Sequence, residues 1–177
     1  SRIATVLGEE TARIVTAVSS EDKALAARAA GAATTVVLAR APLDAAARRA
    51  LAERLKAACG AGTDVVLDPV GGECTEPALR TLRRGGRYVV AGFAAGIPSL
   101  PLNLVLLKQA VVMGARWGAV VAEGAPAFRT TLAALLDATA NGRLRPLISR
   151  RLPLEHAREG LEALRGGHVT GKAVVVC

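Results

Sequence analysis

Short apolar runs that alternate with helix-forming segments are the feature that most limits how this chain can fold. The runs at 34–38 (TTVVL) and 63–68 (TDVVLD) are continuous, and an Ala-, Leu- and Arg-rich segment at 44–59 separates them. Continuous apolar strands that alternate with helices are typical of a parallel sheet covered on both faces. The sequence therefore predicts an α/β fold with a doubly wound parallel sheet.

The same patterns place the remaining elements. Further strands are expected at 12–18, 87–92, 111–117 and 172–176, and helices at 21–30, 75–83, 126–140 and 154–164. Ser20 is placed to cap the first of these helices, and the pair Gly85-Gly86 to stop the second. The segment 94–110 is predicted to be a long loop, and loops of that length in compact α/β domains are often functional.

Composition and charge exclude several classes of partner. The chain has 177 residues, of which 51% are hydrophobic and only 2% aromatic, so the core must be built from Ala, Val and Leu. Few aromatic residues argue against RNA recognition, which stacks bases on aromatic rings. The net charge is +8, but the basic residues are scattered and form no long run. We therefore expect a solvated, Arg-rich surface and no nucleic-acid partner.

The location is expected to be cytoplasmic. The sequence shows no signal peptide and no stretch of roughly 18 apolar residues, the minimum for a membrane span. Cys59, Cys74 and Cys177 show neither a C-x-x-C motif nor metal-ligand spacing. An odd number of unpaired cysteines fits a reducing compartment. No membrane partner is expected.

Three familiar kinds of site are not supported by the sequence. Residues 166–172 match the phosphate-loop pattern G-x-x-x-x-G-K, but a predicted helix precedes them and a predicted strand follows, which is the reverse of the required order. His156 and His168 lie far apart with no third ligand at metal spacing, so no metal site is predicted. The chain contains no G-x-S-x-G motif, which leaves a hydrolase unsupported.

The ends of the predicted strands are the most informative positions. Small, flexible residues follow three of them: Ser19-Ser20, the segment 68–72 (DPVGG) and the segment 92–96 (GFAAG). Doubly wound sheets bind ligands at the carboxyl ends of their strands, and glycines there allow the backbone to approach a ligand closely. A dinucleotide site is therefore expected at this edge.

These stretches, in this order, carry a resemblance that covers nearly the whole chain. It extends over 19–32, 63–72, 82–108, 114–118, 141–164 and 169–176. The chain resembles the C-terminal, cofactor-binding part of the zinc-independent quinone oxidoreductases, the zeta-crystallin-like group of the medium-chain dehydrogenase/reductase superfamily. The resemblance implies a Rossmann-like fold and transfer of a hydride from NADPH to a quinone or an activated enone.

The choice of NADPH over NADH has a physical reason in the sequence. An NAD site places an Asp or Glu near the end of the second sheet strand, where it binds the ribose 2′-hydroxyl. In this chain, Ser19 and Ser20 follow the strand predicted at 12–18, which takes the place of that second strand. Lys23 comes one turn further on. Two hydroxyls and a cation can accept a 2′-phosphate, which a carboxylate would repel. Glu21 and Asp22 follow at once, and they also suit the positive end of a helix.

The resemblance assigns further cofactor contacts. Gly92 and Phe93 are expected to run beside the nicotinamide, and Gly72 and Trp117 to make neighbouring contacts. For Trp117, plain core or interface packing is an equal alternative. Lys172 is also expected to lie close to the cofactor. No catalytic residue is assigned, because the protein's work in such enzymes is to position the cofactor.

Two departures from the family pattern concern the first part of the fold. The first sheet strand and the glycine-rich pyrophosphate loop are both missing from the sequence, as is the family's N-terminal catalytic domain. We therefore expect the chain to be a fragment that is inactive alone. Residues 1–142 are predicted to be an incomplete Rossmann domain, and residues 143–177 a segment that returns to the catalytic domain.

Alternatives to the enzyme remain at this point. The same fold could serve a non-catalytic nucleotide-sensing domain, or a methyltransferase, against which the segment SSEDK at 19–23 counts. The strand at 111–117 is apolar, lacks Pro and is the last in the expected sheet order, so its edge is open. It is predicted to pair with its copy in a homodimer, unless the segment 94–110 covers it.

Overall fold

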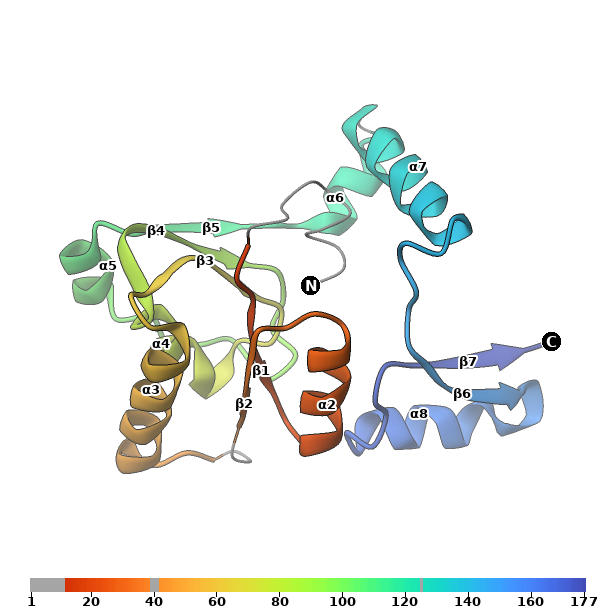
Figure 1. Ribbon diagram of the computed structural model, residues 1–177, viewed down its shortest axis with the longest axis horizontal. Helices are drawn as coiled ribbons and strands as arrows, with labels where there is room; N and C mark the ends of the chain where they lie inside the picture. The colour runs from red at the N-terminus through yellow and green to blue at the C-terminus, as the bar shows by residue number, and fades with distance from the viewer. Residues whose placement is uncertain (1–11, 39–41, 125) are drawn as a thin grey trace. The chain divides into compact units, whose positions relative to one another are not determined.

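The computed structural model describes residues 12–38, 42–124 and 126–177. They divide into two units, and each is described by itself. The central unit comprises the described residues of 39–129, and the split unit comprises those of 1–38 together with 130–177. In each unit, parallel strands are joined by helices (Figure 1), which confirms the predicted α/β class.

The central unit is built on a parallel sheet of order β3-β4-β5. Its strands are β3 (Thr63–Asp68), β4 (Leu82–Val90) and β5 (Val111–Gly114). Its helices are α3 (Ala45–Cys59), the 3-10 turn η1 (Gly72–Cys74), α4 (Thr75–Leu79), α5 (Leu102–Lys108) and α6 (Trp117–Ala122). Because the strands run parallel, the ends of β3 and β4 meet at one edge, where Asp68 stands opposite Val90.

Three predictions for this unit were wrong. The segment 94–110 is not a plain loop, because residues 102–108 form α5. The strand predicted at 111–117 ends at Gly114, and Trp117 begins α6. Gly85 and Gly86 do not stop a helix: α4 ends at Leu79, and both glycines lie inside β4. There the register with β3 shifts, and the positive φ of Gly85 (77°) allows the irregularity.

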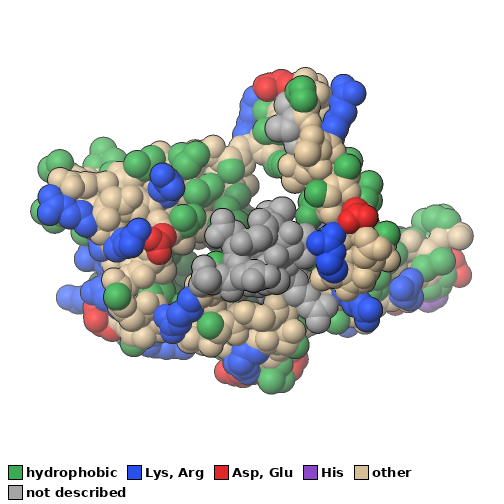
Figure 2. Space-filling model, turned by 45° about the horizontal axis from the view of Figure 1, so that its top comes forward, with side chains coloured by type: hydrophobic (Ala, Val, Ile, Leu, Met, Phe, Trp, Pro, Cys, Tyr) green, Lys and Arg blue, Asp and Glu red, His purple; other side chains and the backbone are tan. Residues whose placement is uncertain are grey.

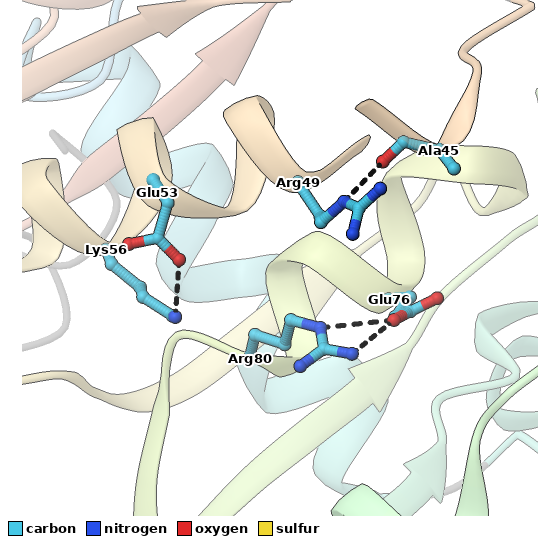
Figure 3. Close-up of polar contacts among 6 residues, drawn as sticks. All are labelled: Ala45, Arg49, Glu53, Lys56, Glu76 and Arg80. Carbon is cyan, nitrogen blue, oxygen red and sulfur yellow. Dashed lines mark hydrogen bonds and ion pairs between the residues drawn. The ribbon is translucent and has the colours of Figure 1, made fainter. Parts of the chain in front are cut away.

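Helix α3 shows how the sequence sets its own limits. The side chain of Asp44 accepts a hydrogen bond from the backbone N–H of Ala47 at 2.7 Å and so caps the helix. One face buries Leu51 and Leu55, and Gly60 with its positive φ ends the helix. Charged side chains pair along both helices, as Figure 3 shows: Lys56 pairs with Glu53 on α3, and Arg80, the residue that ends α4, pairs with Glu76.

The core of the central unit lies under the sheet. Leu79, Leu82 and Tyr88 are almost completely buried, and partly buried Val, Leu and Ala side chains from the strands and α5 pack against them. Tyr88 is the only aromatic side chain in this cluster. The core is therefore mainly aliphatic, as the composition predicted, with one phenol at its centre.

The split unit holds two parallel strand pairs, each joined through a helix. Strands β1 (Val15–Val18) and β2 (Thr34–Val37) are joined by α2 (Glu21–Ala29). Strands β6 (Ile148–Pro153) and β7 (Lys172–Val176) are joined by the 3-10 turn η2 (Leu154–His156) and α8 (Ala157–Arg165). Helix α7 (Pro126–Ala140), whose first residues belong to the central unit, precedes β6. Strand β6 was not predicted, because two arginines interrupt its apolar pattern.

An apolar surface remains exposed on the central unit. Leu102, Leu106 and Leu107 of α5 are 72–78% exposed, and Val111 and Met113 of β5 are about half exposed. Figure 2 shows hydrophobic side chains gathered over this part of the molecule, at its upper left. Among the described residues, no helix has the length and apolar character that a bilayer crossing requires.

Candidate functional site

A carboxylate organises the turn that follows β3. Asp68 is the last residue of that strand, and its Oδ1 accepts hydrogen bonds from the backbone N–H groups of Val70 (2.9 Å) and Gly71 (2.8 Å). Its Oδ2 accepts bonds from the hydroxyls of Thr75 (3.1 Å) and Tyr88 (2.6 Å). One side chain thereby joins the turn to the start of α4 and to the core side chain of β4.

The turn after β4 is bonded to the turn after β3. Ala95 donates its backbone N–H to the carbonyl of Val70 at 2.7 Å, and Gly72 donates to the carbonyl of Gly96 at 2.9 Å. At the base of the two turns, Ala91 donates to the carbonyl of Asp68 at 2.8 Å. Residues 68–72 and 92–96 therefore form one structure, which we call the strand-end platform.

Glycine is required where the two turns touch. Gly72 has a φ of +65°, and a Cβ there would lie 2.7 Å from the carbonyl oxygen of Ala95. A Cβ on Gly92 would lie 2.9 Å from the carbonyl oxygen of Pro69. Both contacts are too short for any side chain. The predicted glycines therefore allow the backbones of two strand ends to come together. Phe93, which follows Gly92, is about half exposed.

Trp117 follows a strand of the same sheet but packs against a residue outside the platform. It begins α6, three residues after β5 ends at Gly114, and it is 55% exposed. Its ring meets that of Phe128 edge-on, with centroids 5.3 Å apart. This is the packing alternative considered for Trp117, although its exposed area leaves the predicted cofactor contact open.

In the split unit, the turn between β1 and α2 collects polar side chains. Ser20 caps α2, and its hydroxyl accepts from the backbone N–H of Lys23 at 3.3 Å. The Lys23 ammonium donates to the Ser19 hydroxyl and to the carbonyl of Gly167, each at 3.0 Å. An ammonium has three N–H donors, so one remains for a ligand. Ser19, Ser20 and Lys23 thus contact one another, and their binding of a 2′-phosphate stays a prediction.

Lys172 belongs to the same unit as Lys23. It begins β7, is exposed, and donates its backbone N–H to the carbonyl of Leu147 at 2.8 Å. Residues 166–171 lie between α8 and β7, which begins at Lys172, so a helix does precede the pattern and a strand does follow. The phosphate-loop pattern is therefore a chance match, as its context predicted.

Three groups in the platform or next to it have shifted pKa values. Burial acts to raise the pKa of Asp68, but the hydrogen bonds from Tyr88, Gly71, Val70 and Thr75 hold the pKa below its ordinary value. Burial and the bond to Asp68 raise the pKa of Tyr88. Burial and the nearby carboxylates raise the pKa of the Cys74 thiol, so that it stays protonated and is a poor nucleophile. At neutral pH the platform is supported by an ionised carboxylate and a neutral phenol.

Asp68, Thr75 and Tyr88 were not predicted as site residues, although Asp68 lies in the segment 68–72. Asp68 and Tyr88 are 20 residues apart, and the parallel register of β3 and β4 brings them together. The available signal was a carboxylate at the end of an apolar strand and a lone tyrosine within the next one. Across the described ranges, no group of three or more His, Cys, Asp and Glu side chains could hold a metal ion.

Glycine-bearing turns at the carboxyl ends of parallel strands, with helical crossovers, define a Rossmann-like nucleotide-binding fold. The family model described as "Zinc-binding dehydrogenase" matches residues 33–175, and the chain belongs to this family. This confirms the resemblance to the medium-chain dehydrogenase/reductase superfamily.

Relatives with curated names are similar over most of this chain. Quinone oxidoreductase-like protein 2 of Bos taurus is 33% identical over 165 residues, which are 93% of this chain and 45% of that protein. Acryloyl-coenzyme A reductase of Metallosphaera sedula is 31% identical over 114 residues, which are 63% of this chain and 32% of that protein. The chain thus spans less than half the length of either relative.

Solved structures confirm the fold. A mycobacterial protein solved in complex with NADPH superposes with a TM-score of 0.81 at 24% identity, over 99% of this chain and 51% of that one. A probable oxidoreductase from Mycobacterium abscessus superposes with a TM-score of 0.70 at 29% identity, over 99% of this chain and 49% of that one.

Proposed function

We propose that this chain is the cofactor-binding part of an NADPH-dependent, zinc-independent oxidoreductase that transfers a hydride to a quinone or an activated enone. The observation that carries the proposal is the strand-end platform, in which two glycine-bearing turns are bonded to each other at the carboxyl ends of adjacent parallel strands. The names of the relatives, a quinone oxidoreductase-like protein and an acryloyl-coenzyme A reductase, support oxidoreductase chemistry over a nucleotide sensor.

The platform fits the nicotinamide end of a dinucleotide. Gly72 and Gly92 leave room only for backbone between the turns, and Phe93 offers an exposed apolar ring beside it. These residues would hold the nicotinamide and keep water away from one side of it, with Trp117 as a further contact. A bound reduced nicotinamide supplies the hydride, so none of these residues needs to act as a nucleophile.

The β1–α2 turn fits the 2′-phosphate that distinguishes NADPH from NADH. Ser19 and Ser20 supply hydroxyls, and Lys23 supplies a cation with one N–H left over. The amino-terminal end of α2 adds a partial positive charge. Glu21 and Asp22 are exposed in the first turn of that helix. Lys172 would add a second cation to the cofactor site.

We also propose a cytoplasmic homodimer through β5. One edge of this strand pairs with β4, and Val111, Val112 and Met113 are 38–50% exposed. Self-pairing about a two-fold axis would satisfy the other edge and bury these side chains. Sedimentation of the complete natural polypeptide at micromolar concentration tests this: we expect a dimer that dissociates when Val111 and Met113 are both replaced by Glu. A monomeric wild type would contradict it.

The proposed function is tested on the complete natural polypeptide. Calorimetric titration should show tighter binding of NADPH than of NADH. The enzyme should then oxidise NADPH when a quinone or an α,β-unsaturated ketone is added, with activity that survives a zinc chelator. No binding of either dinucleotide would contradict the proposal, and loss of activity with the chelator would contradict its zinc-independent part.

A further inference from the structure

The shape of the strand-end platform depends on a single carboxylate. In the turn after β3, the N–H groups of Val70 and Gly71 bond to a side-chain oxygen, Oδ1 of Asp68. The next donor along the turn, Gly72, bonds to the second turn. The direction in which this turn leaves the sheet is therefore set by where the Asp68 carboxylate lies.

Two buried side chains of the core hold the carboxylate in place. Its Oδ2 accepts from Tyr88, which is fully buried, and from Thr75, which is 1% exposed. Tyr88 stands opposite Val66 in the register of β3 and β4, so its hydroxyl reaches two residues along the neighbouring strand to Asp68. An aromatic ring packed against Leu79 and Leu82 is thereby hydrogen-bonded to the carboxylate that holds the turn.

The first turn is in turn hydrogen-bonded to the second. The carbonyl of Val70 bonds to Ala95 and the N–H of Gly72 bonds to Gly96, and both partners follow Phe93 in the second turn. Asp68 is therefore connected to the turn that carries Phe93 through two successive hydrogen bonds, and Tyr88 through three.

We propose that Asp68 and Tyr88 are positioning residues, which hold the strand-end platform in the one arrangement that receives the nicotinamide half of the dinucleotide. The inference rests on the proposed function, and it assigns these two residues to the binding of one half of the cofactor. Lys23, in another part of the chain, would bind the adenosine half. A substitution in one region should therefore change the affinity for one half of the cofactor only.

The test is Tyr88→Phe in the complete natural polypeptide, with each half of the cofactor titrated separately by calorimetry. Removal of the hydroxyl deletes one hydrogen bond to an ionised acceptor and leaves the ring in the core. We expect the affinity for reduced nicotinamide mononucleotide to fall about five- to tenfold, and that for 2′,5′-ADP to stay within twofold. Thr75→Val, which removes the longer bond to the same oxygen, should give a smaller change of the same kind and replaces Tyr88→Phe if that variant does not fold.

The matched control lies at the other end of the same strand pair. Thr63 and Thr81 share a hydrogen bond of 3.1 Å between their hydroxyls, and Thr81 is 5% exposed. Thr63→Val should lower the melting temperature as Tyr88→Phe does, but change neither affinity. A merely structural role for Tyr88 would make the two variants alike, and that result overturns the inference.

The remaining outcomes separate the inference from the proposed function. A wild type that binds both halves, with Tyr88→Phe and Thr75→Val unchanged in nicotinamide affinity, overturns the inference alone. Equal losses for both halves in Tyr88→Phe also overturn it. A wild type that binds neither half overturns the proposed function, and the inference with it.

Discussion

The two candidate binding regions differ in the chemical groups that form them: backbone groups in one, and side chains in the other. In the strand-end platform the two turns are bonded to each other through backbone groups, and the side chains of Tyr88 and Thr75, which hold Asp68, are buried. In the β1–α2 turn the contacts are made by the exposed side chains of Ser19 and Lys23. Backbone sites cannot be altered without disturbing the fold, whereas exposed side chains can be exchanged. We therefore expect the platform to serve any nicotinamide cofactor, and the turn to decide which one.

The largest expected effect comes from a side chain added inside the platform. Gly72→Ala places a Cβ 2.7 Å from a carbonyl oxygen and forces an L residue into a positive φ. We expect a loss of about 2 kcal/mol or more in the free energy of unfolding and at least tenfold weaker binding of both NADPH and NADH. Thermal denaturation and calorimetry measure the two effects. Gly114→Ala, where the added Cβ meets open space, is the control and should be nearly neutral.

The next effect should be selective. Lys23→Ala removes a charge-assisted contact to phosphate, worth about 1.5–3 kcal/mol, and so weakens NADPH binding by about ten- to a hundredfold. Binding of NADH should change less than twofold, because NADH has no 2′-phosphate. Lys56→Ala, in an exposed pair with Glu53, controls for the loss of one positive charge. Equal weakening of both dinucleotides would show that Lys23 does not distinguish them.

A third test separates the charge of Asp68 from its shape. The pKa of this carboxyl is lowered from 3.8, so its ionised form stabilises the fold fully above about pH 4, and this stabilisation is lost as the pH falls through the folded-state pKa. Asp68→Asn has no such titration. Urea unfolding midpoints between pH 6 and about pH 2 should therefore decline more steeply for the wild type than for the variant. Parallel declines would show that Asp68 contributes no ionised bond.

The smallest effect concerns the cap of α2. Ser20→Ala removes the side-chain acceptor for the N–H of Lys23 and should lower stability by about 1 kcal/mol. Ser20→Asp keeps a capping oxygen and adds a carboxylate beside the proposed phosphate site. We expect the Asp variant to be as stable as the wild type but to bind NADPH several-fold more weakly, as measured by calorimetry. Unchanged NADPH affinity in Ser20→Asp would place the phosphate elsewhere.

The elements that the sequence predicted well are those with one dominant pattern. The apolar run at 63–68 became β3, and helix 126–140 has the predicted bounds. The elements missed are those in which patterns conflict. Strand β6 carries Arg150 and Arg151 and is largely exposed, so no hydrophobic periodicity marks it. Helix α5 follows a stretch with two prolines, which favoured a loop.

The same distinction holds within the site. Gly72 and Gly92 could be predicted, because glycine after a strand has a local meaning. The bond between Asp68 and Tyr88 could not, because it depends on the register between two strands and on a shift within it. Periodicity along one strand carries no information about its alignment with the next.

The buried phenol under the platform gives the protein an optical property. Tyr88 is the only tyrosine in the chain, so the ultraviolet absorbance of tyrosinate comes from this one position. Because burial and Asp68 raise its pKa, the phenol stays neutral at alkaline pH values that ionise a free tyrosine, whose pKa is 10.0. Stability gained from the neutral form is full below that value and is lost as the pH rises through the folded-state pKa. A stopped-flow jump to high pH would therefore record, as an absorbance change from one ring, how fast the core beneath the platform opens.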